Sequence, residues 1–271
     1  MLGKLYLIAT PIGNLGDITY RAVETLRNVD IIAAEDTRHS LKLLNYLEIS
    51  KPMISYHRHN EETKSDRLIE KLNNGENIAL VSDAGTPGIC DPGEEVIKKA
   101  IEEKIEVIPI PGACAFVNAL IASGLDTKEF TFLGFLPLNK KLRKEKLDEI
   151  NKSEKTIIIY EAPHKMKNTL TDLKDILNNR KIVLARELTK IHEEFIRSNI
   201  DELIENINNI KGEMILIIAT EKTEEENKLN NLTLKEHYKY YEKQGFDKKE
   251  IIKKIAKDRN VNKNEIYMKF I

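Results

Sequence analysis

The stretch Val81–Gly93, VSDAGTPGICDPG, ends an apolar run and then places three glycines and two prolines around two aspartates. In open α/β sheets, ligands bind beyond the carboxyl ends of the strands, where glycines let the backbone approach a ligand closely. Two further apolar runs end in similar loops, Pro11–Asp17 (PIGNLGD) and Pro111–Cys114 (PGAC). Three such loops exceed what turn chemistry requires, and they predict a small-molecule site at one edge of a sheet.

The rest of the chain predicts which sheet this is. Short apolar runs rich in β-branched residues alternate with segments of helical periodicity. In the first half we expect strands at 4–10, 31–35, 53–56, 78–82 and 107–110, with helices at 18–28, 37–47, 61–74 and 94–103. This alternation predicts a mostly parallel sheet covered on both faces. A second set follows, with strands at 130–133, 156–160, 181–185, 194–198 and 214–219 and helices at 140–150, 164–177 and 201–207.

The simplest partition is therefore two α/β domains, at 1–123 and 124–220. Residues 221–232 have almost no apolar content and are expected to be a linker. Three capping-box patterns then follow, Thr233 with Glu236, Asp247 with Glu250 and Asn262 with Glu265. They predict helices at 234–244, 248–258 and 263–270, a compact helix-turn-helix-like unit spanning 233–271. From its residues alone, this unit fits nucleic-acid binding and simple packing equally well.

Composition limits the class of protein. The 271 residues are 41% hydrophobic and 32% charged, which is ordinary for a globular protein. Apolar stretches fall short of the roughly 20 residues that span a bilayer, and the N-terminus does not resemble a signal peptide. We expect a cytoplasmic protein with no membrane partner. Cys90 and Cys114 lack metal-ligand spacing and are expected to be buried, reduced thiols, so neither a metal nor a disulfide is predicted.

Charge is distributed unevenly along the chain. From Thr233 onward there are eleven basic and six acidic residues, a net charge of +5, whereas the rest of the chain carries −6. A basic tail on an acidic body suggests a polyanionic partner, although the general abundance of lysine explains it equally well. The loops match neither G-x-G-x-x-G nor G-x-x-x-x-G-K-[ST], which disfavours a dinucleotide or a nucleoside triphosphate as ligand.

Eight motifs occur in an order that resembles a known family: LYLIATPIGNLGDITYRAVETL, IIAAEDTRHS, ALVSDAGTPGICDPG, IPGACA, TFLGFLP, YEAPHK, LARELTK and KGEMILII. Over residues 4 to about 220 the chain resembles the tetrapyrrole-methylase-like superfamily, the class III S-adenosylmethionine-dependent methyltransferases. More narrowly, it resembles the branch that methylates the ribose 2′-oxygen of a decoding-region cytidine in small-subunit (16S) rRNA. The three-helix unit is similar to that branch's appended domain.

The resemblance implies a cofactor cleft between two α/β domains, a homodimer, and rRNA or the assembled small ribosomal subunit as partner. S-adenosyl-L-methionine is the implied methyl donor, and no metal is required. By motif position, the cofactor-binding residues are Pro11, Ile12, Asp83, Gly85, Thr86, Ile89, Ala115, Phe116, Tyr160, Leu188 and Met214. Without the family, most of the apolar ones would be assigned to the core.

Methyl transfer requires the acceptor oxygen to be held in line with the departing sulfur, and a proton acceptor helps because a hydroxyl is a poor nucleophile. Candidates follow the second and third strands: Asp36 or His59 as base, with Glu35 and Arg38 beside them. Asp36 could instead cap the following helix, and His59 could be an ordinary surface histidine. Arg38 and Arg58 would suit phosphate positioning.

Three further stretches could contact RNA: 140–146 (KKLRKEK), 186–190 (RELTK) and the exposed side of the last helix, with Lys263, Asn264, Tyr267 and Lys269. Two alternatives stay open at this stage. One keeps the fold and changes the acceptor to a small molecule, such as a tetrapyrrole, or to a substrate of the diphthamide pathway. The other is a helix-turn-helix regulator that senses a ligand, for which some 220 residues of sensor would be generous.

Overall fold

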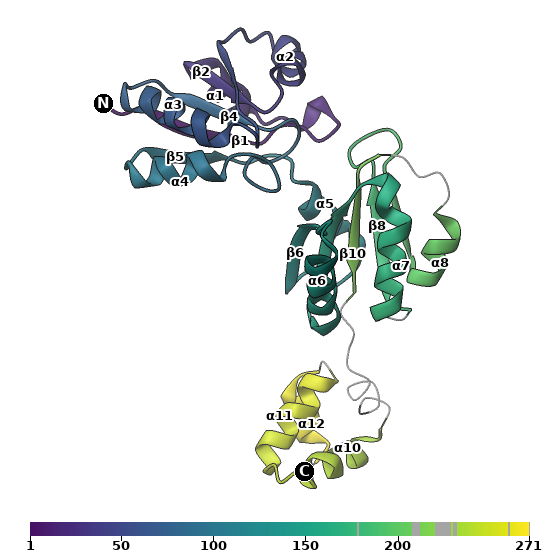
Figure 1. The fold of residues 1–271 in the computed structure, drawn as a ribbon. Helices are drawn as coiled ribbons and strands as arrows, with labels where there is room; N and C mark the ends of the chain where they lie inside the picture. The colour runs from purple at the N-terminus through teal and green to yellow at the C-terminus, as the bar shows by residue number, and fades with distance from the viewer. Residues whose placement is uncertain (178, 208–211, 220–228, 230–231, 260, 271) are drawn as a thin grey trace. The chain divides into compact units, whose positions relative to one another are not determined.

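The computed structural model describes residues 1–271 apart from 178, 208–211, 220–228, 230–231, 260 and 271. The chain forms two compact units, Met1–Ala219 and Thr220–Ile271, and each is described separately. Most of the predicted linker, 221–232, lies outside the described residues. The first unit contains two five-stranded sheets with their helices, so the predicted α/β class is confirmed (Figure 1).

The first sheet is entirely parallel, as its alternation of strands and helices predicts, with the order β3-β2-β4-β1-β5. Its strands are β1 Lys4–Ile8, β2 Ile31–Ala34, β3 Met53–Ser55, β4 Ile78–Val81 and β5 Glu106–Ile110. Its helices are α1 Tyr20–Asn28, α2 Thr37–Tyr46, α3 Glu61–Asn73 and α4 Glu94–Glu102, and a short 3-10 turn, η1, covers Leu15–Asp17.

Alternate residues of these strands enter two different cores, because successive side chains of a strand point to opposite faces. Leu5 and Leu80 pack with the apolar side of α3 and α4. Ile8 and Ile32 pack with Leu26 of α1 and with α2 on the other face. With both faces covered, the loops at the strand ends are the part of this sheet left to bind a ligand.

The second sheet is mixed, and the sequence did not reveal this. It has the order β6-β7-β10-β8-β9; β6 pairs with β7 in parallel, and the other three pairings are antiparallel. Its strands are β6 Phe130–Phe135, β7 Thr156–Glu161, β8 Lys181–Arg186, β9 Glu194–Asn199 and β10 Met214–Ile218. The helices around it are α5 Ala115–Ser123, α6 Lys140–Lys152, α7 Met166–Leu177 and α8 Ile200–Asn206, with the 3-10 turn η2 at Pro163–Lys165.

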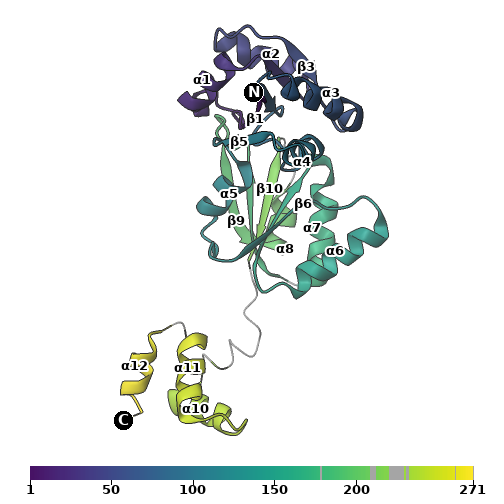
Figure 2. The same cartoon turned by 90° about the vertical axis from the view of Figure 1, so that its left-hand side faces the viewer.

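Helices lie on both faces of the second sheet (Figure 2). Ile157 and Ile159 of β7 pack with α6, α7 and α8, whereas Ile158 packs with Ala119 and Leu120 of α5. Helix α5 was not predicted, because AFVNALIAS is apolar almost throughout and has no amphipathic period. The boundary near residue 123 stays a prediction, and the packing of α5 favours a boundary before residue 115.

The second unit contains three helices among its described residues: α10 Leu234–Glu242, α11 Lys248–Asp258 and α12 Lys263–Met268. Two of the predicted capping boxes are confirmed, at Thr233 with Glu236 and at Asp247 with Glu250. The third differs: Asn262 accepts from the amide of Asn264, while Glu265 pairs with Lys269.

A small apolar core centred on Tyr241, Ile251, Ile255 and Ile266 holds these three helices together. In the part of the chain that the structure describes, no helix is both long enough and apolar enough to cross a membrane.

Candidate active site

The three Pro/Gly loops of the first sheet meet, which answers why the chain places so many glycines after β4. Thr10 and Gly85 exchange two backbone hydrogen bonds, of 2.8 and 3.0 Å, and the Thr86 hydroxyl donates to the carbonyl of Ala113 at 3.2 Å. Gly85 has φ +79°, and a Cβ there would lie 3.3 Å from Cγ2 of Ile12. Only glycine adopts this backbone without strain while the loop stays against Ile12.

The end of the loop after β4 is also anchored. A carboxylate oxygen of Glu61, at the start of α3, accepts the amide of Gly93 at 2.8 Å. Cys90 has a left-handed backbone with φ 63°, and a guanidinium nitrogen of Arg58 donates to its carbonyl oxygen. A non-glycine residue rarely holds this conformation unless its surroundings enforce it, and such strain clusters at functional sites.

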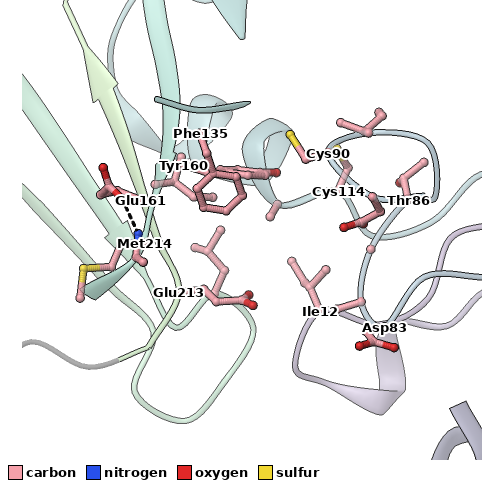
Figure 3. Close-up of a pocket in the computed structure, with 18 of the residues that line it drawn as sticks. Ile12, Asp83, Thr86, Cys90, Cys114, Phe135, Tyr160, Glu161, Glu213 and Met214 are labelled. Atoms are coloured by element: carbon pink, nitrogen blue, oxygen red, sulfur yellow. Dashed lines mark hydrogen bonds between the residues drawn. The ribbon is translucent and has the colours of Figure 1, made fainter. Parts of the chain in front are cut away.

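A cavity of about 430 Å³ lies between these loops and the strand ends of the second sheet. Ile12, Asp83, Thr86 and Cys114 lie on one side of it, and Glu161, Glu213 and Met214 lie on the other (Figure 3). Its lining residues are Ile12, Glu35, Asp83, Ala84, Gly85, Thr86, Ile89, Cys90, Asp91, Cys114, Ala115, Phe135, Tyr160, Glu161, Ala162, Pro163, Glu187, Leu188, Lys190, Glu213, Met214 and Ile215. The volume suits a small-molecule ligand.

Aromatic side chains of the second sheet, Phe135 and Tyr160, line part of the cavity. The Tyr160 ring makes edge-to-face contacts with Phe132 and Phe135, at centroid distances of 4.9 and 5.6 Å. The Tyr160 hydroxyl accepts the amide of Phe116 at 3.2 Å, and burial raises its pKa. Phe135 is 57% exposed although it lines the cavity, so one aromatic ring is available to a ligand.

Six carboxylates line the cavity, and those beside the second sheet have partners or face solvent. Glu161 accepts the amide of Ala162 at 2.8 Å and the hydroxyl of Thr169 at 2.5 Å. Glu187 pairs with Lys190 at 3.0 Å, and Glu213 is exposed.

The other three carboxylates, Glu35, Asp83 and Asp91, lie on the side of the first sheet. Asp83 accepts the amide of Asp36 at 3.0 Å, and its own amide donates to Glu35 at 3.5 Å. Burial raises the pKa of Glu35. Burial, followed by the charge of Glu35, raises the pKa of Asp91 to about 6, against the opposing effects of Ser82 and Arg58. Carboxylates with raised pKa values in a cavity are candidates for a functional site.

Only one of the four residues predicted to be catalytic lines the cavity. Glu35 lines the cavity, whereas Asp36, Arg38 and His59 are absent from its lining. Asp36 caps α2 by accepting the amide of Arg38 at 2.9 Å, and it pairs with the Arg38 guanidinium at 2.8 Å, which holds its pKa well below the usual range. His59 is exposed. Asp36 therefore lacks the basicity that a proton acceptor needs.

Most residues predicted to bind the cofactor do line the cavity: Ile12, Asp83, Gly85, Thr86, Ile89, Ala115, Tyr160, Leu188 and Met214. Pro11 and Phe116 do not, and their role stays a prediction. The sequence reasoning did not select Asp91 or Phe135, although both lie within quoted motifs. Cys90 and Cys114 are free but only partly buried, so the prediction of buried thiols was wrong, because both lie beside the cavity.

The lining can be tested against S-adenosyl-L-methionine, whose sulfonium and amino groups are positive and whose adenosine is largely apolar. The carboxylates match the positive groups, and Ile12, Leu188 and Ile215 offer apolar walls. Lys190 is the one basic side chain among the described lining residues, which suits a ligand without phosphates. No group of three or more His, Cys, Asp or Glu side chains in the described part of the chain is placed to hold a metal ion.

Comparison with known proteins identifies the class. A family model for tetrapyrrole (corrin/porphyrin) methylases matches residues 4–204. Solved structures share the fold: a diphthine synthase with TM-score 0.65 and 13% identity, covering 80% of this chain and 90% of that one. A uroporphyrin-III C-methyltransferase from Thermus thermophilus, complexed with S-adenyl homocysteine, has TM-score 0.59 and 15% identity over 80% and 97% of the two chains.

Curated proteins are much more similar. The ribosomal RNA small subunit methyltransferase I of Halalkalibacterium halodurans is 52% identical over 98% of this chain and 93% of its own length. That of Bacillus subtilis is 50% identical over the same shares. The chain therefore belongs to the tetrapyrrole methylase family and, within it, to the ribosomal RNA small subunit methyltransferase I family. As in its class III family, S-adenosyl-L-methionine is the methyl donor.

Proposed function

We propose that the chain transfers a methyl group to the ribose 2′-oxygen of a cytidine in the decoding region of small-subunit rRNA. The observation that carries this proposal is the 52% and 50% identity, over 98% of the chain, to two proteins named for methylation of small-subunit ribosomal RNA. The choice of cytidine and of the 2′-oxygen follows from the motif resemblance. Such a substrate also implies a cytoplasmic protein.

The donor would occupy the 430 Å³ cavity. S-adenosyl-L-methionine supplies an electrophilic methyl group on a positively charged sulfur. The loop residues Ile12, Gly85 and Thr86 would approach it through their backbone, and Leu188 and Met214 would cover its apolar part. Asp83 would face its positive groups. The main task of these residues is orientation, because the acceptor oxygen must meet the methyl carbon in line with the sulfur.

The acceptor nucleotide would enter beside Phe135. Single-stranded RNA is bound by splaying a base out and stacking it on an aromatic ring, and Phe135 is 57% exposed at the cavity. Its contact with Tyr160, at 5.6 Å between ring centroids, would keep the ring in place.

Three surfaces are candidates for contact with RNA. In α6, Lys140, Lys141 and Lys144 are exposed, whereas Arg143 pairs with Asp172 at 2.8 Å and is committed to the fold. In the stretch 186–190, Arg186 pairs with Glu194 at 2.6 Å and Lys190 pairs with Glu187 at 3.0 Å. These ion pairs make the stretch a weaker candidate for contact with RNA.

In α12 and beside it, Lys263, Asn264, Tyr267 and Lys269 are all exposed, as predicted. These residues would contact phosphates and position the RNA, while specificity would come from the cavity.

The test uses labelled S-adenosyl-L-methionine and small ribosomal subunits from cells that lack this protein, followed by nucleoside mass spectrometry. We expect one new 2′-O-methylcytidine, which is absent without enzyme, and a parallel reaction on naked rRNA identifies the preferred particle. Donor binding without any ribose mark would overturn the choice of acceptor and leave the fold and family untouched.

We also propose a homodimer, as the motif resemblance implies. Val117 and Ile121 of α5 are 42% and 67% exposed, an apolar surface of the kind that protein interfaces cover. Light scattering should give twice the mass of one chain, and Ile121→Lys should reduce it to that of a monomer. A monomeric wild-type protein would contradict the proposal.

A further inference from the structure

The proposed reaction leaves one chemical role unassigned. A ribose hydroxyl is a poor nucleophile at neutral pH, and a side chain that accepts its proton at the transition state accelerates such reactions by about 10²–10⁴-fold. The acceptor must lie in the cavity where the donor and the ribose meet. The six lining carboxylates are the natural candidates.

Contacts exclude most of them. Both oxygens of Glu161 already accept hydrogen bonds, from Ala162 and Thr169, and Glu161 is only 4% exposed. Glu187 is paired with Lys190 at 3.0 Å. Glu213 is exposed to solvent. Asp83 holds the backbone of Asp36 at 3.0 Å, so it fixes the neighbouring loop. Glu35 and Asp91 are left.

Asp91 has the surroundings of a proton acceptor. The charges that act on it are Glu35 after β2, Arg58 after β3, and Asp83 in its own loop. Burial raises its pKa to about 6, with the charge of Glu35 as the next cause. A carboxylate of this kind is ionised at neutral pH and is still more basic than an ordinary aspartate, which is what general-base catalysis needs.

Asp91 also lies where the two walls of the cavity approach each other. Asp91 and Tyr160 of β7 both line the cavity. The sulfur of the neighbouring Cys90 lies against β6, because a Cβ on Gly134 would lie 2.8 Å from it. The loop that carries Asp91 therefore meets the strand that carries Phe135, the exposed ring that would hold the acceptor base, and both residues line the cavity.

The strained backbone before Asp91 fits this role. Cys90 has φ 63°, a conformation that residues other than glycine adopt only at an energetic cost. The bond from Arg58 to the carbonyl of Cys90 holds it there. Because Arg58, which follows β3, holds Cys90 in this conformation, the backbone direction at Asp91 is fixed as well.

We propose that Asp91 is the residue that accepts the proton of the ribose 2′-hydroxyl during methyl transfer; this rests on the proposed function. The ribose oxygen forms a bond to the methyl carbon while the carbon–sulfur bond breaks. The sulfur keeps the electron pair of that bond, and the hydroxyl proton passes to the carboxylate of Asp91. Glu35 acts through Asp91, as a positioning residue whose charge keeps Asp91 basic.

The experiment is a single-turnover measurement with saturating donor and unmethylated small ribosomal subunits, from pH 5 to 9, for the wild type, Asp91→Asn and Glu102→Gln. Glu102 is an exposed carboxylate at the end of α4 and serves as the matched control. Donor affinity by calorimetry and thermal unfolding report whether each variant folds and binds.

We expect Asp91→Asn to be about 100-fold slower or more, with donor affinity kept. The wild-type rate should rise with pH through an apparent pKa near 6, and this rise should be lost in Asp91→Asn. Asp91→Glu, which keeps a carboxylate, should recover part of the rate. The control should match the wild type.

Two different failures are distinguishable. If Asp91→Asn is as fast as the wild type, or keeps the rise with pH, Asp91 is not the proton acceptor and the proposed function stands. A rate loss that more donor restores would also overturn the proposal, because it would show a binding role. If the wild type forms no 2′-O-methylcytidine, the proposed function fails, and the ribose can no longer be the proton donor.

Discussion

Two clusters of polar side chains in this molecule are built in opposite ways. At the cavity, Glu35, Asp83 and Asp91 gather three like charges. In the three-helix unit, Asp258 is shared by His237 at 3.0 Å and Tyr241 at 2.6 Å, and Arg259 donates to the other ring nitrogen of His237 at 3.2 Å. The first cluster gathers carboxylates and lies at a cavity. In the second cluster, the donors and acceptors are paired with one another.

The contrast separates function from stability. A matched network stabilises the fold and loses stability when one member is removed, whereas like charges in a cavity raise pKa values and cost stability. Both clusters perturb pKa values, so a shift by itself does not identify a catalytic group. The position of the carboxylates in a cavity and the shared sign of their charges are what distinguish the first cluster as a candidate catalytic group.

Asp258→Ala should give the largest loss. The side chain of Asp258 is 9% exposed and that of His237 is fully buried, so truncation leaves His237 and Tyr241 without their shared acceptor. Removing one partner of a buried charged network costs about 3–5 kcal/mol. Denaturant unfolding of the full chain should show this loss for the helical unit, while donor affinity stays unchanged. Lys249→Ala, exposed in the same helix, should cost little; equal stability of the two variants would show that the network is not structural.

Thr169→Val tests the matched network beside the cavity. Thr169 is fully buried, donates to Glu161 at 2.5 Å and accepts from Arg143 at 2.8 Å. Valine has the same shape, so the loss isolates the hydrogen bonds and should be about 1–3 kcal/mol. Thr171→Val is the control, because Thr171 is exposed in the same helix. If thermal unfolding of Thr169→Val matches that of the control, Glu161 is not held by Thr169, and its exclusion as a proton acceptor is weakened.

Glu35→Gln tests the unmatched cluster. Removing this like charge should lower the pKa of Asp91 from about 6, because the charge of Glu35 is the second cause of its elevation. The rise of the single-turnover rate with pH should move to lower pH, by about one unit for a close neighbour. The pH–rate profile measures this directly. An unmoved profile would mean that Glu35 does not act on the titrating group.

Acid sensitivity of the three-helix unit should be the smallest effect. Burial lowers the pKa of His237 from its ordinary 6.5, against the opposing charge of Asp258. Above 6.5 His237 is neutral in both states and its contribution is complete. As the pH falls from there through the lower folded pKa, the unfolded chain gains the proton more readily, and stability is lost. Unfolding of the unit between pH 8 and 5 should show this decline, and His237→Gln should abolish it.

Local patterns in the sequence predicted the described strands, most helices and the loops that line the cavity. Alternation of apolar runs and amphipathic segments identified the ten strands because periodicity and β-branched content are local properties. The glycine and proline density of 81–93 predicted a loop that lines the cavity for an equally local reason, since Gly85 needs a positive φ. Helix α5 was missed because its nine residues have no amphipathic period.

The sheet pairings and the pKa shifts of the carboxylates depend on tertiary structure. Whether a strand pairs in parallel depends on a distant partner, so the mixed second sheet could not be read from its runs. The same holds for the carboxylates. Asp36 and Asp91 are the same residue type in similar motifs, but Arg38 lowers the pKa of one, while burial and Glu35 raise that of the other. A side chain's basicity is set by neighbours that folding brings from elsewhere in the chain, which a local pattern does not contain.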